Sequence, residues 1–270
     1  PVDGLPMRIT REIAQKNARI LVNAAGDTDK LQSMPVNELM ALVPHTFKDY
    51  FFWSPVPGAG DYPGDPGQAG IREETGNIPV MIGNALCEFS GPADSQDKSQ
   101  VTEGEVVKKL SEKYGLKGPV LYDIYKKTYP NLKPYYALTL IPMAFRQDVN
   151  LFSEKRADLS GAPVYEYLLT YESAYNGGTI SWHGVELPFV FHNAEDKGCV
   201  FSGEQTWVTQ EEIFNAWIHF AKYGNPNHDL LPKWDPFTRE HRACMVFGAP
   251  SACRVNHDEE LLSIINELKG

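Results

Sequence analysis

Cysteine is scarce in this sequence, which has four in 270 residues and none in a C-x-x-C pair. So few cysteines cannot form a disulfide scaffold, and their spacing excludes zinc-ribbon and thioredoxin-type sites. Cys244 and Cys253 flank a possible hairpin, MVFGAPSACRV. A disulfide between them and two buried thiols both remain open at this point.

Positive charge and long apolar runs are lacking too. The formal net charge is −10, which disfavours binding to a phosphate backbone. No apolar run approaches the roughly 20 residues that cross a bilayer. The first residues show no charged start followed by an apolar stretch, so no secretion signal is visible. We therefore expect a soluble chain that binds neither nucleic acid nor membrane, in an unknown compartment.

The composition that remains is that of an ordinary globular protein, 42% hydrophobic and 22% charged. A chain of 270 residues can bury one large core or two small ones. Thirteen Phe, thirteen Tyr and five Trp supply rigid rings that suit a core with an apolar pocket.

Helical patterns recur along the chain, and two of them begin at apparent capping boxes. Thr102 with Glu105 predicts one helix start, and Thr209 with Glu212 predicts another. Other helices are predicted over residues 10–24, PVNELMALV, LYDIYKKTY, YYALTLIPMAFRQDV and the C-terminal stretch around Leu261 and Ile265.

Extended patterns are fewer. IPVMIG (78–83) and PVYEYLLTY (163–171) indicate strands buried on both faces, and CMVFG indicates a third. Residues 51–77 are dense in Pro and Gly and indicate an irregular stretch. Strands separated by long helical segments predict an α/β architecture with a parallel sheet, covered by helices from residues 84–160. Three strands are few for such a sheet, which points to an incomplete one.

Two residues stand where α/β proteins place reactive groups, just beyond the carboxyl ends of strands. Glu88 lies five residues after Gly83, and His183 lies in the loop after VYEYLLTY. A carboxylate that orients an imidazole, which in turn activates a serine, is the arrangement of a serine hydrolase. In α/β-hydrolases the order along the chain is serine, acid, base.

Four segments carry a family resemblance. IPVMIGNALCEFS resembles the type-B carboxylesterase (cholinesterase and para-nitrobenzyl esterase) family, in which the acid follows a strand-ending Gly by five positions. HGVELPFVF resembles the family signature that begins with the catalytic His. WIHFAKYGNPN and LPKWDPF resemble the family's later helix end and turn. The resemblance implies that Glu88 is the catalytic acid and His183 the base.

One family feature is missing. No G-x-S-x-G nucleophile elbow and no oxyanion loop of the His-Gly-Gly type occur in the 270 residues. We therefore expect residues 1–270 to be the C-terminal portion of one α/β-hydrolase catalytic domain, with few strands and many helices. Its partners are then an ester substrate and an N-terminal half or companion chain that carries the serine. Self-association is also possible through the uncovered surface.

The function expected from this resemblance is hydrolysis of carboxylic esters through an acyl-enzyme, with no cofactor. This chain alone should have little or no activity, because it lacks the nucleophile. The alternative is a non-catalytic, cholinesterase-like interaction module, although such relatives have usually lost a triad residue. A metal-dependent hydrolase that uses His183 and Glu186 lacks a third ligand at sensible spacing.

Three aromatic residues and one carboxylate complete the expected site. Glu186 is predicted to hold the His183 loop in place from a second layer. Candidate pocket residues are Phe89, Trp182 and Phe191, and the aromatic cluster at residues 50–53 could also line an acyl or alcohol pocket.

Overall fold

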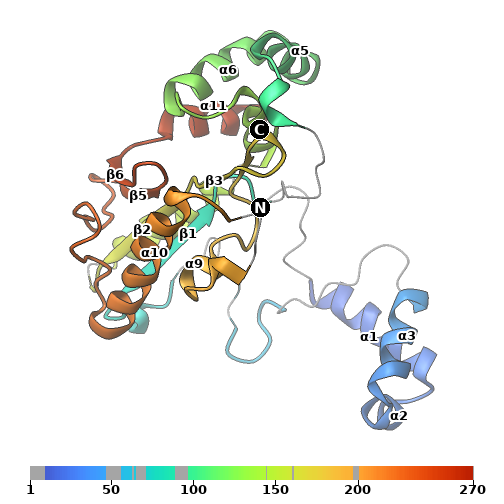
Figure 1. Ribbon diagram of the computed structural model, residues 1–270. Helices are drawn as coiled ribbons and strands as arrows, with labels where there is room; N and C mark the ends of the chain where they lie inside the picture. Colours follow the sequence, from blue (N-terminus) through green and yellow to red (C-terminus); the bar gives the residue numbers. More distant parts are fainter. Residues whose placement is uncertain are drawn as a thin grey trace. The chain divides into compact units, whose positions relative to one another are not determined.

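The computed structural model divides the chain into two compact units, Pro1–Gly70 and Ile71–Gly270, which are described separately (Figure 1). The described residues are 10–46, 56–62, 64, 71–88, 97–143, 145–159, 161–196 and 201–269. The aromatic cluster at residues 50–53 and Phe89 lie outside them. A single domain over residues 1–270 stays a prediction.

The described residues of the first unit form three helices. Its first helix was predicted over residues 10–24; the Thr10 hydroxyl accepts a hydrogen bond from the Ile13 N–H at 3.2 Å and starts it. Gly26, at φ 108°, ends it. The helices are α1 (Arg11–Ala25), α2 (Thr28–Ser33) and α3 (Val36–Thr46). Both helices predicted in this part of the chain are confirmed.

The described part of the second unit is built on a four-stranded sheet in the order β1-β2-β5-β6. The first three strands are parallel, and β6 returns antiparallel to β5 through the predicted hairpin. A separate two-stranded ladder, β3-β4, precedes the His183 loop. The strands are β1 (Val80–Ala85), β2 (Val164–Leu169), β3 (Glu172–Ser173), β4 (Thr179–Ile180), β5 (Ala243–Phe247) and β6 (Ala252–Val255).

The prediction that both long strands are buried on both faces is right for β2 and wrong for β1. Every residue of β2 except Tyr167 is buried, whereas the first four residues of β1 are only half-buried. The reason is position, because β1 is the edge of the four-stranded sheet among the described residues. Gly83 allows β1 to approach β2 closely, since a Cβ atom there would lie 2.4 Å from the Tyr167 ring.

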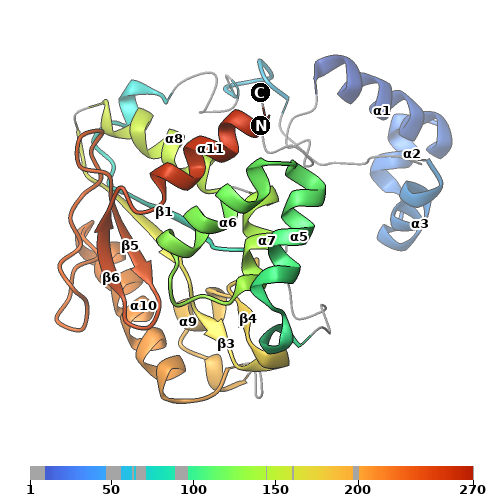
Figure 2. The same cartoon turned by 90° about the horizontal axis from the view of Figure 1, so that it is seen from above.

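Helices cover both faces of this sheet (Figures 1 and 2). Alternate residues of β2 enter different cores: Leu168 packs with helices α5, α6, α7 and α11, and Leu169 packs with α9 and α10. These helices are α5 (Glu103–Tyr114), α6 (Lys117–Thr128), α7 (Ala137–Leu140), α8 (Arg146–Ala157), α9 (Leu187–Val190), α10 (Glu204–Tyr223) and α11 (Glu259–Lys269). The predicted α/β class and the helical cover from residues 84–160 are confirmed.

One predicted capping box is present and the other is not. Thr102 and Glu105 exchange both hydrogen bonds of the motif at the start of α5. Thr209 and Glu212 lie inside α10, which begins earlier, at Glu204. Both side chains are buried there, and the Glu212 carboxylate accepts a hydrogen bond from Ser251 at 2.6 Å. Their spacing reflects tertiary contacts and not a helix start.

Candidate active site

Glu88 ends a short turn that follows β1. The Leu86 N–H donates to the Leu169 carbonyl at 3.0 Å, which continues the pairing with β2 for one residue beyond the strand. The Ala85 N–H then donates to Glu88 Oε1 at 2.8 Å. This bond folds the carboxylate back over the end of the strand, where its side chain is 14% exposed.

His183 follows β4 and is joined to the turn that carries Glu88. The Cys87 N–H donates to the Ser181 carbonyl at 3.0 Å, and the His183 N–H donates to the Glu88 carbonyl at 2.6 Å. The side chains meet as well, with His183 Nδ1 2.6 Å from Glu88 Oε2. The hydrogen bond expected between the two side chains is therefore present.

This geometry determines the chemistry available to the imidazole. A carboxylate only accepts, so Nδ1 carries the proton of that bond and Nε2 is the basic nitrogen of the neutral ring. The His183 side chain is 73% exposed, while Glu88 is largely covered. The pair therefore presents a basic nitrogen at the surface and keeps the orienting carboxylate behind it. Its catalytic role stays a prediction.

Glu186 lies three residues after His183, at the start of α9. Burial raises the pKa of its carboxyl; a main-chain hydrogen bond opposes the rise, and the negative charge of Glu88 adds to it. Burial also raises the pKa of Tyr167, with further contributions from Glu186 and Glu88. Tyr167 was not among the residues expected near the site. Only its register opposite Gly83 in the parallel sheet brings it there.

Two of the three predicted pocket residues, Trp182 and Phe191, lie among the described residues. Trp182 is half-buried, with its ring 6.1 Å from that of Phe201. Phe191 is 69% exposed beyond the end of α9. A role for either residue in substrate binding stays a prediction.

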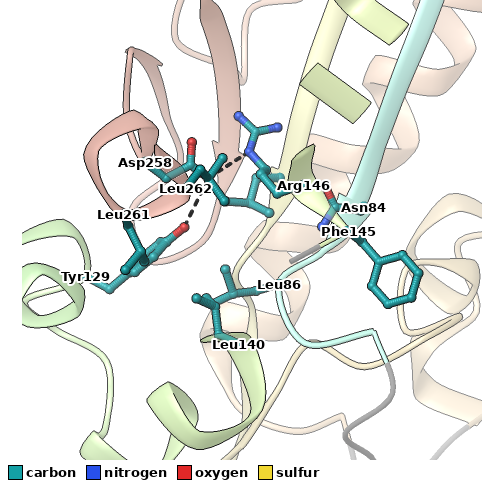
Figure 3. Close-up of a pocket in the computed structure, with 10 residues that line it drawn as sticks. Asn84, Leu86, Tyr129, Leu140, Phe145, Arg146, Asp258, Leu261 and Leu262 are labelled. Atoms are coloured by element: carbon teal, nitrogen blue, oxygen red, sulfur yellow. Dashed lines mark hydrogen bonds and ion pairs between the residues drawn. The ribbon is translucent and has the colours of Figure 1, made fainter. Parts of the chain in front are cut away.

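A cluster of four polar residues lies buried between α8, β2 and α11. Arg146 forms ion pairs with Glu166 at 2.6 Å and with Asp258 at 2.8 Å, and the Tyr129 hydroxyl lies 3.4 Å from Asp258. All four residues are less than a tenth exposed. Arg146, Asp258 and Tyr129 form part of the wall of a small cavity (Figure 3). Burial raises the pKa of Glu166, although Arg146 opposes the shift.

His257 adjoins this group, and its ring meets that of Tyr129 edge-on at 5.1 Å. Burial lowers the pKa of His257 from 6.5 to about 4; Asp258 opposes the shift, and Arg254 and Arg146 add to it. The unfolded chain therefore binds a proton between about pH 6.5 and pH 4 that the folded chain does not. The contribution of His257 to the free energy of unfolding is fully present above pH 6.5. It falls as the pH decreases, by about 3 kcal/mol at pH 4.

We expect His257→Gln to flatten the decline in stability between pH 7 and pH 4. Urea unfolding at several pH values measures the effect, with His241→Gln as the control at a histidine whose side chain is 47% exposed. Equal slopes for His257→Gln and the unsubstituted chain would contradict the assignment.

Metal, disulfide and membrane features can be stated for the described residues. Among them no group of three or more His, Cys, Asp or Glu is arranged to hold a metal ion. Cys244 and Cys253 are not bridged; the register places Cys253 opposite Met245. No helix in the described part of the chain is long and apolar enough to cross a membrane.

Three parallel strands, with a carboxylate–imidazole pair formed by a residue after β1 and a residue after the β3-β4 ladder, define this unit as part of an α/β-hydrolase fold. A model of the carboxylesterase family matches residues 2–263. The chain belongs to the carboxylesterase family, which confirms the resemblance predicted from the sequence motifs.

This chain is similar to known esterases in sequence and in structure. The para-nitrobenzyl esterase of Bacillus subtilis (strain 168) is 24% identical over 275 residues, which cover 95% of this chain and 53% of the relative. Human cocaine esterase is 33% identical over 106 residues, 35% of this chain and 18% of the relative. A Clostridium hathewayi esterase, described as able to hydrolyse aliphatic aromatic polyesters, has a TM-score of 0.79 at 27% identity.

The match to the Clostridium hathewayi esterase covers 94% of this chain and 52% of the chain of that esterase. A thermophilic para-nitrobenzyl esterase, with a TM-score of 0.66 at 20% identity over 96% of this chain and 55% of that one, shares the fold. The chain thus spans about half the length of the relatives that it matches throughout, and it aligns with their C-terminal half.

Proposed function

We propose that this chain supplies the acid and the base of a serine carboxylesterase. The observation that carries the proposal is the 2.6 Å contact between Glu88 Oε2 and His183 Nδ1 beside an exposed imidazole. Family membership gives the reaction class, hydrolysis of carboxylic esters. The retention of both residues in bonded contact favours an enzyme over the non-catalytic interaction module.

In the proposed reaction His183 acts through Nε2. It removes the proton of a serine hydroxyl as the oxygen attacks the ester carbonyl, then donates that proton to the departing alcohol. A water molecule attacks the acyl-enzyme in the same way and releases the acid. Glu88 fixes the tautomer of His183 and stabilises the imidazolium that forms in each step.

The nucleophile is proposed to come from a segment outside this sequence, either an N-terminal half or a companion chain. The 270 residues contain no G-x-S-x-G elbow. The half-buried edge strand β1 is where such a segment would add a neighbouring strand. Glu186 would then hold the His183 loop, and Trp182 and Phe191 would border the substrate once the segment covers them.

The test compares the purified chain with the chain co-expressed with an upstream segment of a relative that contains the elbow serine. We expect little hydrolysis of a p-nitrophenyl ester by the chain alone. We expect hydrolysis with an initial burst of p-nitrophenol from the assembled pair. Serine-type hydrolysis by the isolated chain would contradict the assignment of the nucleophile, and an inactive, stably assembled pair would contradict the proposed function.

Solution mass tests the association in the same samples. The proposal expects a complex with the upstream segment, or self-association when the chain is alone, because edge strands and uncovered apolar surface favour pairing. A chain that stays a stable monomer and does not bind the added segment would contradict the proposed association.

A further inference from the structure

Asn84 is a buried amide for which the sequence pattern gives no reason. It lies in β1 opposite Leu168 and is 9% exposed. A buried amide is costly unless its groups are hydrogen-bonded. Its Nδ2 donates to the Ala85 carbonyl at 2.8 Å, while its Oδ1 has no hydrogen-bond partner among the described residues.

The residue that accepts the hydrogen bond from Asn84 is Ala85, which also binds the Glu88 carboxylate. The Ala85 N–H holds Glu88 Oε1 at 2.8 Å, and the Ala85 carbonyl accepts from Asn84. The two peptide groups that flank the Ala85 Cα atom are thus each bound by a side chain. Together the bonds restrict the φ and ψ angles of Ala85, from which the turn to Glu88 starts.

We propose that Asn84 is a positioning residue for the Glu88–His183 pair. Through Ala85 it holds the turn that places Glu88 Oε2 against His183 Nδ1, and it touches neither substrate nor imidazole. This inference rests on the proposed function for its catalytic consequence, but its structural content concerns only the pair.

The cavity beside Asn84 offers no competing role as a substrate site. Asn84 lines it together with Arg146 and Asp258 (Figure 3). Its volume is about 10 Å³, room for about one water molecule. The donor Nδ2, which binds the Ala85 carbonyl, is therefore the atom that matters for the turn.

Three substitutions separate the donor from the bulk of the side chain. Asn84→Asp keeps the shape and Oδ1 but replaces the NH₂ donor by a second oxygen. Asn84→Leu removes both the donor and the oxygen. Asn84→Ser keeps a small donor. The control is Asn150→Leu on α8, which removes another amide whose Oδ1 has no partner among the described residues.

The readout is the tautomer of His183 in the purified, ¹⁵N-labelled chain, measured from the two ring nitrogen shifts at about pH 9, where an imidazole is neutral. We expect the share of rings protonated on Nε2 to rise about twofold or more in Asn84→Asp and Asn84→Leu. Asn84→Ser and Asn150→Leu should resemble the unsubstituted chain. An unchanged tautomer in Asn84→Asp would overturn the proposal; if Asn84→Leu does not fold, the Asp and Ser variants decide it.

Kinetics of the assembled enzyme give a second readout. We expect Asn84→Asp to lower kcat about 10- to 100-fold with KM unchanged, because a misplaced acid weakens the base and not substrate binding. A rise in KM alone would overturn the proposal. If the assembled wild-type pair is inactive while the tautomer still shifts, the proposed function fails and the positioning of the pair by Asn84 stands.

Discussion

Glu88→Gln is expected to lower kcat about 10⁴-fold in the enzyme assembled from this chain and a serine-bearing segment. An amide NH₂ group opposite Nδ1 would favour the imidazole tautomer with its proton on Nε2, which cannot accept the serine proton. It would also leave the imidazolium without a counter-charge. The measurement is steady-state hydrolysis of a p-nitrophenyl ester, with KM followed separately.

A matched control exists in the same unit. His192 Nε2 lies 2.6 Å from Glu211 Oε1, so a second carboxylate–imidazole contact of the same length can be changed in the same way. Glu211→Gln should leave kcat unchanged. Comparable losses in Glu88→Gln and Glu211→Gln would indicate general destabilisation and would count against the triad assignment.

Arg146→Met is expected to destabilise the chain by about 3–5 kcal/mol. The substitution removes the only cation that contacts both Glu166 and Asp258 among the described residues, and it leaves two buried carboxylates near each other. The folded chain must then bury uncompensated negative charge or take up a proton. Urea unfolding at neutral pH measures the loss of stability. The loss should shrink as the pH falls and Glu166, whose pKa is raised by burial, takes up a proton.

Arg239→Met provides the comparison for this prediction. Arg239 also binds two carboxylates, Glu154 at 2.9 Å and Asp158 at 2.6 Å, but its side chain is 49% exposed. Exposed ion pairs contribute about 0–1 kcal/mol, so the same substitution should have a small effect there. Equal losses at Arg146 and Arg239 would show that burial of the first cluster has no energetic consequence.

The sequence allowed the Glu88–His183 contact to be predicted because each residue lies shortly beyond a strand. The rule for the carboxyl ends of parallel strands accounts for Glu88 after β1, whereas the chain reaches His183 from β2 through the β3-β4 ladder, which the sequence pattern did not predict. The apolar runs that became β1, β2 and β5 and the capping box of α5 rest on local patterns of the same kind.

Residues that depend on register or on tertiary contacts could not be predicted this way. Tyr167 reaches the site only through the pairing of β1 with β2, and the bond from Asn84 to the neighbouring Ala85 carbonyl depends on a side-chain conformation that the strand pattern does not reveal. Thr209 and Glu212 have the spacing of a capping box, but their polar groups are used inside the fold. The half-burial of β1 depends on which strands flank it, which its own residues do not encode.

The double connection between Glu88 and His183 bears on when the pair proposed to be catalytic forms. One main-chain and one side-chain hydrogen bond, each 2.6 Å long, join the two residues. The two bonds together restrict rotation of the His183 side chain. The rotational freedom of the imidazole is therefore lost when residues 71–270 fold and not when a substrate arrives. A hydroxyl group brought beside Nε2 meets a base that is already oriented, and assembly has only the hydroxyl left to place.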